Sequence, residues 1–76
     1  MPTRAYILIE TQVGKSRDVV TALRSLPDVP SADIITGDFD IIAQIESADM
    51  VSMADLVTGR VQSIPGVIRT ITCVVA

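Results

Sequence analysis

The sequence has no histidine and a single cysteine, Cys73, and both shortages exclude common kinds of site. Without histidine, the side chain most often used as a general acid, a general base or a metal ligand is missing. One cysteine allows neither an internal disulfide nor a metal site built from several thiolates. Cys73 lies in a strand-like apolar run, so we expect a small buried side chain, with a reactive thiol as the alternative. We expect no metal site, no cofactor and no catalytic residue.

Aromatic and basic residues are also scarce, which argues against nucleic-acid binding. Tyr6 and Phe39 are the only aromatic side chains, so few side chains could stack on nucleic-acid bases. The six Lys and Arg residues stand singly and are outnumbered by nine Asp and Glu residues, for a net charge of −3. Direct binding of DNA or RNA depends mainly on clustered positive charge, which this sequence lacks.

Long apolar runs are absent too. No segment approaches the ~20 apolar residues of a membrane span, and no signal-peptide pattern opens the chain, so we expect a cytoplasmic protein without membrane contact. Apolar residues are nevertheless plentiful, at 49% of the 76 residues. A single domain of this size buries only about 60% of its surface on folding. We therefore expect a partner subunit to cover the surplus apolar surface.

Four strand-like runs and two helical runs alternate along the chain. The expected strands lie at 4–10, 32–36, 39–46 and 67–75, and the expected helices at 16–26 and 49–64. Ser16 would cap the first helix, and Ser47 or Asp49 the second. The order β-α-β-β-α-β predicts an α+β, ferredoxin-like fold, with a four-stranded antiparallel sheet and both helices on one face.

Residues 32–46 are the centre of this pattern, because two strand-like runs meet there at Gly37-Asp38. Gly-Asp between such runs predicts a two-residue hairpin turn. The second run alternates, which is typical of a strand with one apolar face and one mixed face. The apolar set, expected toward the helices, is Phe39, Ile41, Ala43 and Ile45.

The open face of the sheet is expected to be too apolar for water and too polar for an ordinary core. If odd-numbered strand residues face the helices, it carries Tyr6, Leu8, Glu10, Asp40, Ile42, Gln44, Glu46, Ile68, Thr70, Thr72 and Val74. A second copy would cover it sheet on sheet, with edge strands paired in a closed, dimeric α/β barrel. The alternative is a monomer with a half-wetted sheet.

Two motifs in this order resemble the effector-binding (RAM) domain of the Lrp/AsnC family, named after the leucine-responsive regulatory protein. They are Ile35-Thr36-Gly37-Asp38-Phe39-Asp40 and the corner Ile64-Pro65-Gly66-Val67, which is followed by Thr70 and Thr72. The resemblance covers essentially the whole chain, so residues 1–76 are expected to form a single effector-binding and oligomerisation domain. Family members join this domain to an N-terminal helix-turn-helix. Only Met1-Pro2-Thr3 precedes the first strand here, so a stand-alone version without a helix-turn-helix is expected.

The resemblance implies a regulatory module. Such domains form dimeric barrels, often assembled further into an octamer of four dimers, and bind a small effector, typically an amino acid, between subunits. A stand-alone member would sense the ligand itself, or it would join the oligomers of a full-length regulator of the same family without any ligand. A ligand that prefers one assembly state shifts the equilibrium between them, so a site at an interface suits regulation.

The candidate site follows from the chemistry of a free amino acid. The turn at Gly37-Asp38 would offer backbone N–H groups to the carboxylate, and Asp38 or Asp40 would pair with the ammonium group. The expected ligand-binding residues are Thr36, Gly37, Asp38, Phe39, Asp40, Thr70 and Thr72. The alternative is that these residues have only a structural role, because Gly and Asp are ordinary turn residues and threonines are common on sheets.

A small enzyme is the alternative reading, because dimeric α/β-barrel monooxygenases and isomerases share this architecture. The carboxylate pairs Asp38/Asp40 and Glu10/Glu46 would then be the candidates for catalysis. The missing histidine and the scarce aromatic residues count against it, so no enzyme is expected. Amino-acid-binding ACT modules share the element order, but they would lack the Gly-Asp-Phe-Asp turn.

Overall fold

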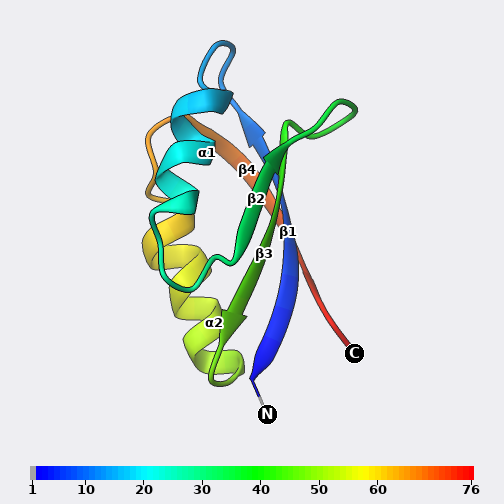
Figure 1. Cartoon of the computed structure of the whole chain (residues 1–76), viewed down its shortest axis with the longest axis vertical. Helices are drawn as coiled ribbons and strands as arrows, with labels where there is room; N and C mark the ends of the chain where they lie inside the picture. Colours follow the sequence, from blue (N-terminus) through cyan, green and yellow to red (C-terminus); the bar gives the residue numbers. More distant parts are fainter. Residues whose placement is uncertain (1) are drawn as a thin grey trace.

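The computed structural model describes residues 2–76 and confirms the ferredoxin-like arrangement (Figure 1). Its elements are β1 (Thr3–Thr11), α1 (Ser16–Arg24), β2 (Ser31–Ile34), β3 (Ile41–Ser47), α2 (Met50–Leu56), the π-helical turn η1 (Val57–Val61) and β4 (Val67–Val74). The strands form one antiparallel sheet in the order β2-β3-β1-β4. Both helices lie on the same face of this sheet. No helix within residues 2–76 is long and apolar enough to cross a membrane.

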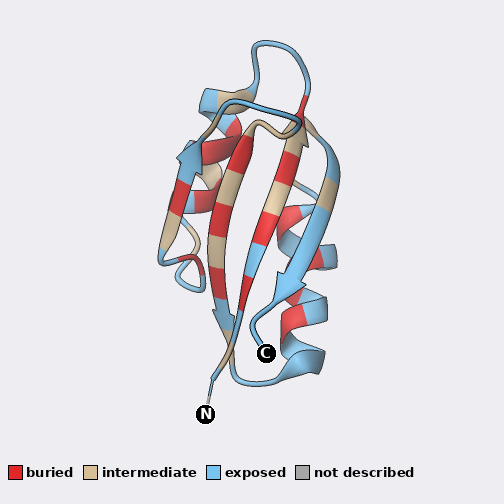
Figure 2. Ribbon diagram, turned by 90° about the vertical axis from the view of Figure 1, so that its right-hand side faces the viewer, coloured by how far each residue is buried: buried red, intermediate tan, exposed pale blue. Residues whose placement is uncertain are grey.

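The core lies between the helices and the two central strands, β1 and β3. Residues paired across antiparallel strands share a face, and here Ile7 pairs with Ala43 and Ile9 with Ile41. The buried apolar strand residues are Ala5, Ile7, Ile9, Ala32, Ile41, Ala43 and Ile45. Figure 2 shows the resulting alternation of buried and less buried positions along both central strands. The predicted alternation is thus confirmed for β3 from Ile41 onward.

The helices begin in different ways. Asp49, one of the two predicted caps, caps α2, because its side chain accepts a hydrogen bond from the Ser52 backbone N–H at 2.8 Å. This bond lowers the pKa of the Asp49 carboxyl. Ser16 does not cap α1: Lys15 occupies the cap position without a side-chain hydrogen bond, and the Ser16 hydroxyl lies 2.8 Å from Thr11 Oγ1.

The predicted facing of the last strand is wrong. Ile7 pairs with Thr72 and Ile9 with Thr70, so both threonines lie on the helix side of the sheet. The open face instead carries Arg69, Ile71 and Cys73 from β4, opposite Glu10, Leu8 and Tyr6. An odd residue of β1 meets an odd residue of β3 but an even residue of β4, and a bulge between Glu10 and Thr11 shifts the register further along.

Cys73 is exposed, so the expectation of a buried side chain is wrong for the single chain. Its strand is the cause, because β4 lies at the edge of the sheet and none of its eight residues is buried. Figure 2, with the open face toward the viewer, shows β4 as the least buried strand of the sheet.

Candidate functional site

The predicted two-residue turn is wrong, and a longer loop joins β2 to β3. The Ile35 backbone N–H donates to the Asp40 carbonyl at 2.8 Å, which leaves residues 36–39 as the loop. Gly37 has a φ of +135°, but no non-glycine residue among 2–76 has a positive φ. A type I′ turn needs positive φ at both central residues, so Asp38 cannot complete one. In Figure 1 the loop projects beyond the sheet on the side away from the helices.

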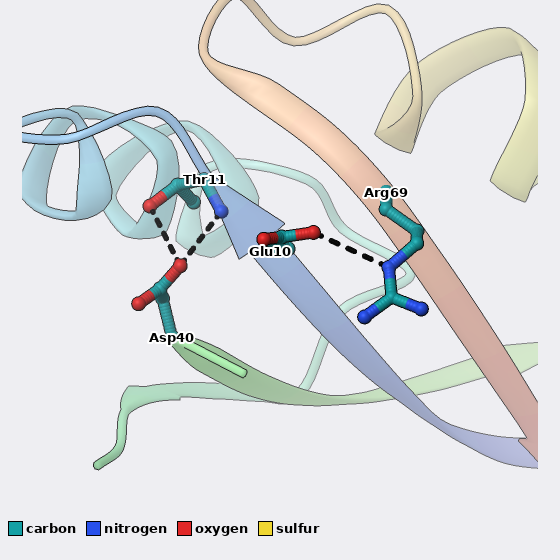
Figure 3. A network of polar contacts seen from close by, with 4 residues as sticks. All are labelled: Glu10, Thr11, Asp40 and Arg69. Atoms are coloured by element: carbon teal, nitrogen blue, oxygen red, sulfur yellow. Dashed lines mark hydrogen bonds and ion pairs between the residues drawn. The ribbon is translucent and has the colours of Figure 1, made fainter. Parts of the chain in front are cut away.

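Asp40 fixes the base of this loop to the end of β1 (Figure 3). Its Oδ2 accepts hydrogen bonds from the Thr11 backbone N–H at 2.8 Å and from Thr11 Oγ1 at 3.3 Å. The Asp40 backbone N–H also donates to the Ile9 carbonyl at 2.9 Å. Thr11 is buried, so this carboxylate satisfies a donor that has lost access to water. The same contacts occupy one of the two oxygens that Asp40 would offer to a ligand.

Arg69 joins the loop to the open face of the sheet. Its Nε donates to Glu10 Oε1 at 3.2 Å, and its Cζ lies 4.9 Å from the centroid of the Phe39 ring (Figure 3). Phe39 is therefore on the open-face side with Arg69, and its predicted place beside Ile41 toward the helices is wrong. A cation over an aromatic ring at this distance is attracted to the face of the ring.

The structure brings together only part of the predicted site. Thr36, Gly37 and Asp38 form the exposed tip of the loop, and Phe39 and Asp40 are half-buried at its base. Thr70 and Thr72 lie across the sheet from them, where Thr70 Oγ1 accepts a hydrogen bond from Gln62 Nε2 at 3.0 Å. Thr72 lines an apolar groove of about 300 Å³ beside α2.

Arg69 was missed by the sequence reasoning, which placed it on the helix side. The register of β4 against β1 decides its position, and no local pattern in the sequence reports that register. Opposite charges were the one sequence signal for this contact. Glu10 ends the first expected strand, and Arg69 lies near the start of the last one.

The open face is organised in rows that cross the strands. One row is apolar, with Leu8 between Ile42 and Ile71. The next is polar: Ser31 Oγ donates to Gln44 Oε1 at 3.2 Å, and Gln44 Nε2 donates to the Tyr6 hydroxyl oxygen at 3.1 Å. Charged pairs flank these rows, Glu10 with Arg69 on one side and Arg4 opposite Glu46 on the other.

Known proteins resemble this chain over nearly all of its length. Among solved structures, FFRP-DM1 is 27% identical, with a TM-score of 0.94 over 97% of this chain and 99% of that one. A hypothetical protein of Pyrococcus horikoshii is 28% identical, with a TM-score of 0.92 over 100% of this chain and 90% of that one. A transcriptional regulator of Neisseria meningitidis, solved as a complex with L-Met, shares the fold at 24% identity and a TM-score of 0.88, over 97% of this chain and 49% of its own.

A curated relative and a family model point the same way. An uncharacterized HTH-type transcriptional regulator of Pyrococcus abyssi is 31% identical over 70 residues. These cover 92% of this chain but 44% of the regulator, so the chain spans less than half the length of that relative. The model of the Lrp/AsnC ligand binding domain matches residues 4–76. The chain therefore belongs to the Lrp/AsnC ligand-binding domain family.

Proposed function

We propose that this chain is a regulatory module that assembles through the open face of its sheet and binds a small effector, an amino acid, between subunits. Its output would be a change in assembly, either of its own oligomer or of one that it forms with a full-length regulator of the same family. The uncovered open face is the observation that carries this proposal.

The apolar row on that face is poorly suited to water. Ile71 is 40% exposed and so is Tyr6 in the neighbouring row, while Leu8 and Ile42 are half-buried. Full burial of such a side chain contributes ~1.5–3 kcal/mol, so completing the burial of four half-covered ones would contribute roughly 4 kcal/mol in total. A second copy placed sheet on sheet would supply this cover, with matching rows of charge at the ends of the face.

The edges of the sheet also favour assembly. β2 and β4 are edge strands, and no residue of β4 is buried. The apolar groove of about 300 Å³ runs beside β4 on the helix side, lined by Met50, Met53, Ala54, Val57, Thr58, Thr72 and Val74. Pairing of edge strands between two copies would satisfy the free backbone groups and close the barrel.

The loop at 36–39 is the proposed place of the effector. Its tip is exposed, its base is fixed by Asp40, and it projects toward the side where the second copy would pack. A ligand held between the loop and the partner would bind only the assembled state and would stabilise it by mass action. That the same fold occurs in a regulator solved as a complex with L-Met supports an amino acid as the ligand.

Sedimentation velocity at micromolar concentration tests the assembly. The wild-type chain should sediment as a dimer or larger, and I71D, which puts a charge into the apolar row, should sediment as the 8.1 kDa monomer. V51D is the matched control, because Val51 is 73% exposed on α2, away from the open face. Equal masses for I71D and the wild type would contradict assembly through this face.

A thermal-shift screen with the twenty amino acids tests the ligand. Selective stabilisation by one or a few of them would support a sensor. If none stabilises the chain, and it instead co-purifies in mixed oligomers with a full-length regulator, the ligand part of the proposal is wrong and the chain is an interaction subunit.

A further inference from the structure

We propose that Arg69 is the carboxylate-binding group of the effector site, and that the ligand therefore carries a free carboxylate; this rests on the function proposed above. The loop at 36–39 would then serve to position the ligand, while the guanidinium group supplies the charge that recognises it.

The guanidinium of Arg69 is held in place and still has its outer end available. Nε is occupied by Glu10 at 3.2 Å, and the Phe39 ring covers one side at 4.9 Å. Within residues 2–76 the two terminal nitrogens make no hydrogen bond, and in Figure 3 they are turned away from the Glu10 carboxylate. The Arg69 side chain is 56% exposed, so a ligand can reach these nitrogens.

This arrangement suits a carboxylate. The two terminal N–H groups of a guanidinium form a planar fork that matches the two oxygens of a carboxylate, and such bidentate pairs are among the stronger hydrogen-bonded contacts. Because Phe39 and Glu10 already restrain the side chain, less conformational entropy is lost when a ligand binds. An ion pair as exposed as Glu10–Arg69 contributes little to folding, so Arg69 can be replaced without loss of the fold.

The surroundings favour an α-amino acid over a simple acid. Glu10 Oε2 makes no hydrogen bond within the described chain. A carboxylate oxygen that can accept a hydrogen bond from an ammonium group therefore lies beside the guanidinium. Arg69 also lines a groove of about 410 Å³ at the edge strand β4, together with Gln62, Val67, Ile68 and Thr70, which leaves room for a ligand side chain.

The test compares ligand binding by the wild type, R69Q and R69K. Isothermal titration uses the amino acids that stabilise the wild type, and for each of them its primary amide. R69Q should lower the affinity for the free acid at least about tenfold, and R69K should lower it less. Neither substitution should change the affinity for the amide, which is already weaker in the wild type. R24Q is the matched control, because Arg24 also forms one exposed ion pair, with Asp33 at 3.6 Å, but on α1.

Three results would overturn the proposal, and they are distinguishable. If R69Q binds the free acid as the wild type does, the assignment of Arg69 is wrong while the proposed function stands. If R69Q no longer assembles by sedimentation in the absence of ligand, Arg69 pairs instead with a carboxylate of the second copy. If no amino acid binds the wild type, the proposed sensor function fails, and this inference fails with it.

Discussion

Replacing Gly66 with alanine should remove about half of the stability of the fold. Gly66 has a φ of +99°, which is costly for a residue with a side chain. A Cβ atom there would lie 2.9 Å from Lys15 Cβ and 3.2 Å from Val19 Cγ2. Val19 is buried in the core, and Lys15 Cβ is tied to a backbone whose carbonyl accepts the Val19 N–H at 3.0 Å, so neither neighbour moves freely. The backbone at Gly66 is itself fixed by the hydrogen bond from the Gln12 N–H to its carbonyl at 2.8 Å.

The expected loss follows from these two strains. A positive φ costs a non-glycine residue ~1–2 kcal/mol, and an overpacked methyl group costs ~1–3 kcal/mol. Together they lower the free energy of unfolding by roughly 2–5 kcal/mol. A chain of 76 residues is expected to have only about 4–11 kcal/mol in total. The expected loss is therefore a large share of the total free energy of unfolding.

Urea unfolding followed by circular dichroism measures this loss. With an m-value of about 1–2 kcal/mol/M, the midpoint for G66A should fall by at least about 1 M at unchanged m, at one fixed protein concentration because association would add to stability. G59A is the matched control: no heavy atom lies within 4 Å of a Cβ at Gly59, its φ is not positive, and alanine favours helix by ~0.5–1 kcal/mol. G59A should be slightly more stable than the wild type. A midpoint for G66A equal to that of the wild type would refute this reasoning.

Three further outcomes are expected from other parts of the chain. Replacing Asp40 with alanine leaves the buried Thr11 N–H without its acceptor and should cost ~1–3 kcal/mol of unfolding free energy, whereas D40N keeps an acceptor oxygen and should cost less; equal losses would count against the contact. Because the pKa of Asp49 is lowered from 3.8 in the folded chain, its cap stabilises α2 above that value and is lost as the pH falls through the lower folded pKa. The D49A penalty in Tm should therefore be present at neutral pH and disappear in strong acid, and a penalty independent of pH would argue against it. Cys73 should react with a thiol reagent much more slowly in the assembled wild type than in I71D, and equal rates would place it outside the interface.

The central part of the fold could be predicted from the sequence because it depends on local alternation and on burial. Ile41, Ala43 and Ile45 alternate with more polar residues, and a central strand with one covered face has a single way to bury them. The cap at Asp49 and the corner at Pro65-Gly66 are local signals of the same kind. They were read correctly because no distant contact competes with them.

The predictions that proved wrong concern features that depend on contacts between distant segments of the chain. Thr70 and Thr72 face the helices because of the register of β4 on β1, which a pattern within one strand cannot report. Gly37-Asp38 is not a tight turn, since Asp40 is held by Thr11 and the loop must reach across to it. The sequence therefore placed the connection between β2 and β3 at the right residues, but it did not place Arg69 on the open face.

Sedimentation velocity of the unmodified chain at micromolar concentration tests most directly whether a second copy covers the open face. We expect a particle of at least twice the 8.1 kDa chain mass, with no monomer boundary. A single boundary at 8.1 kDa would contradict it.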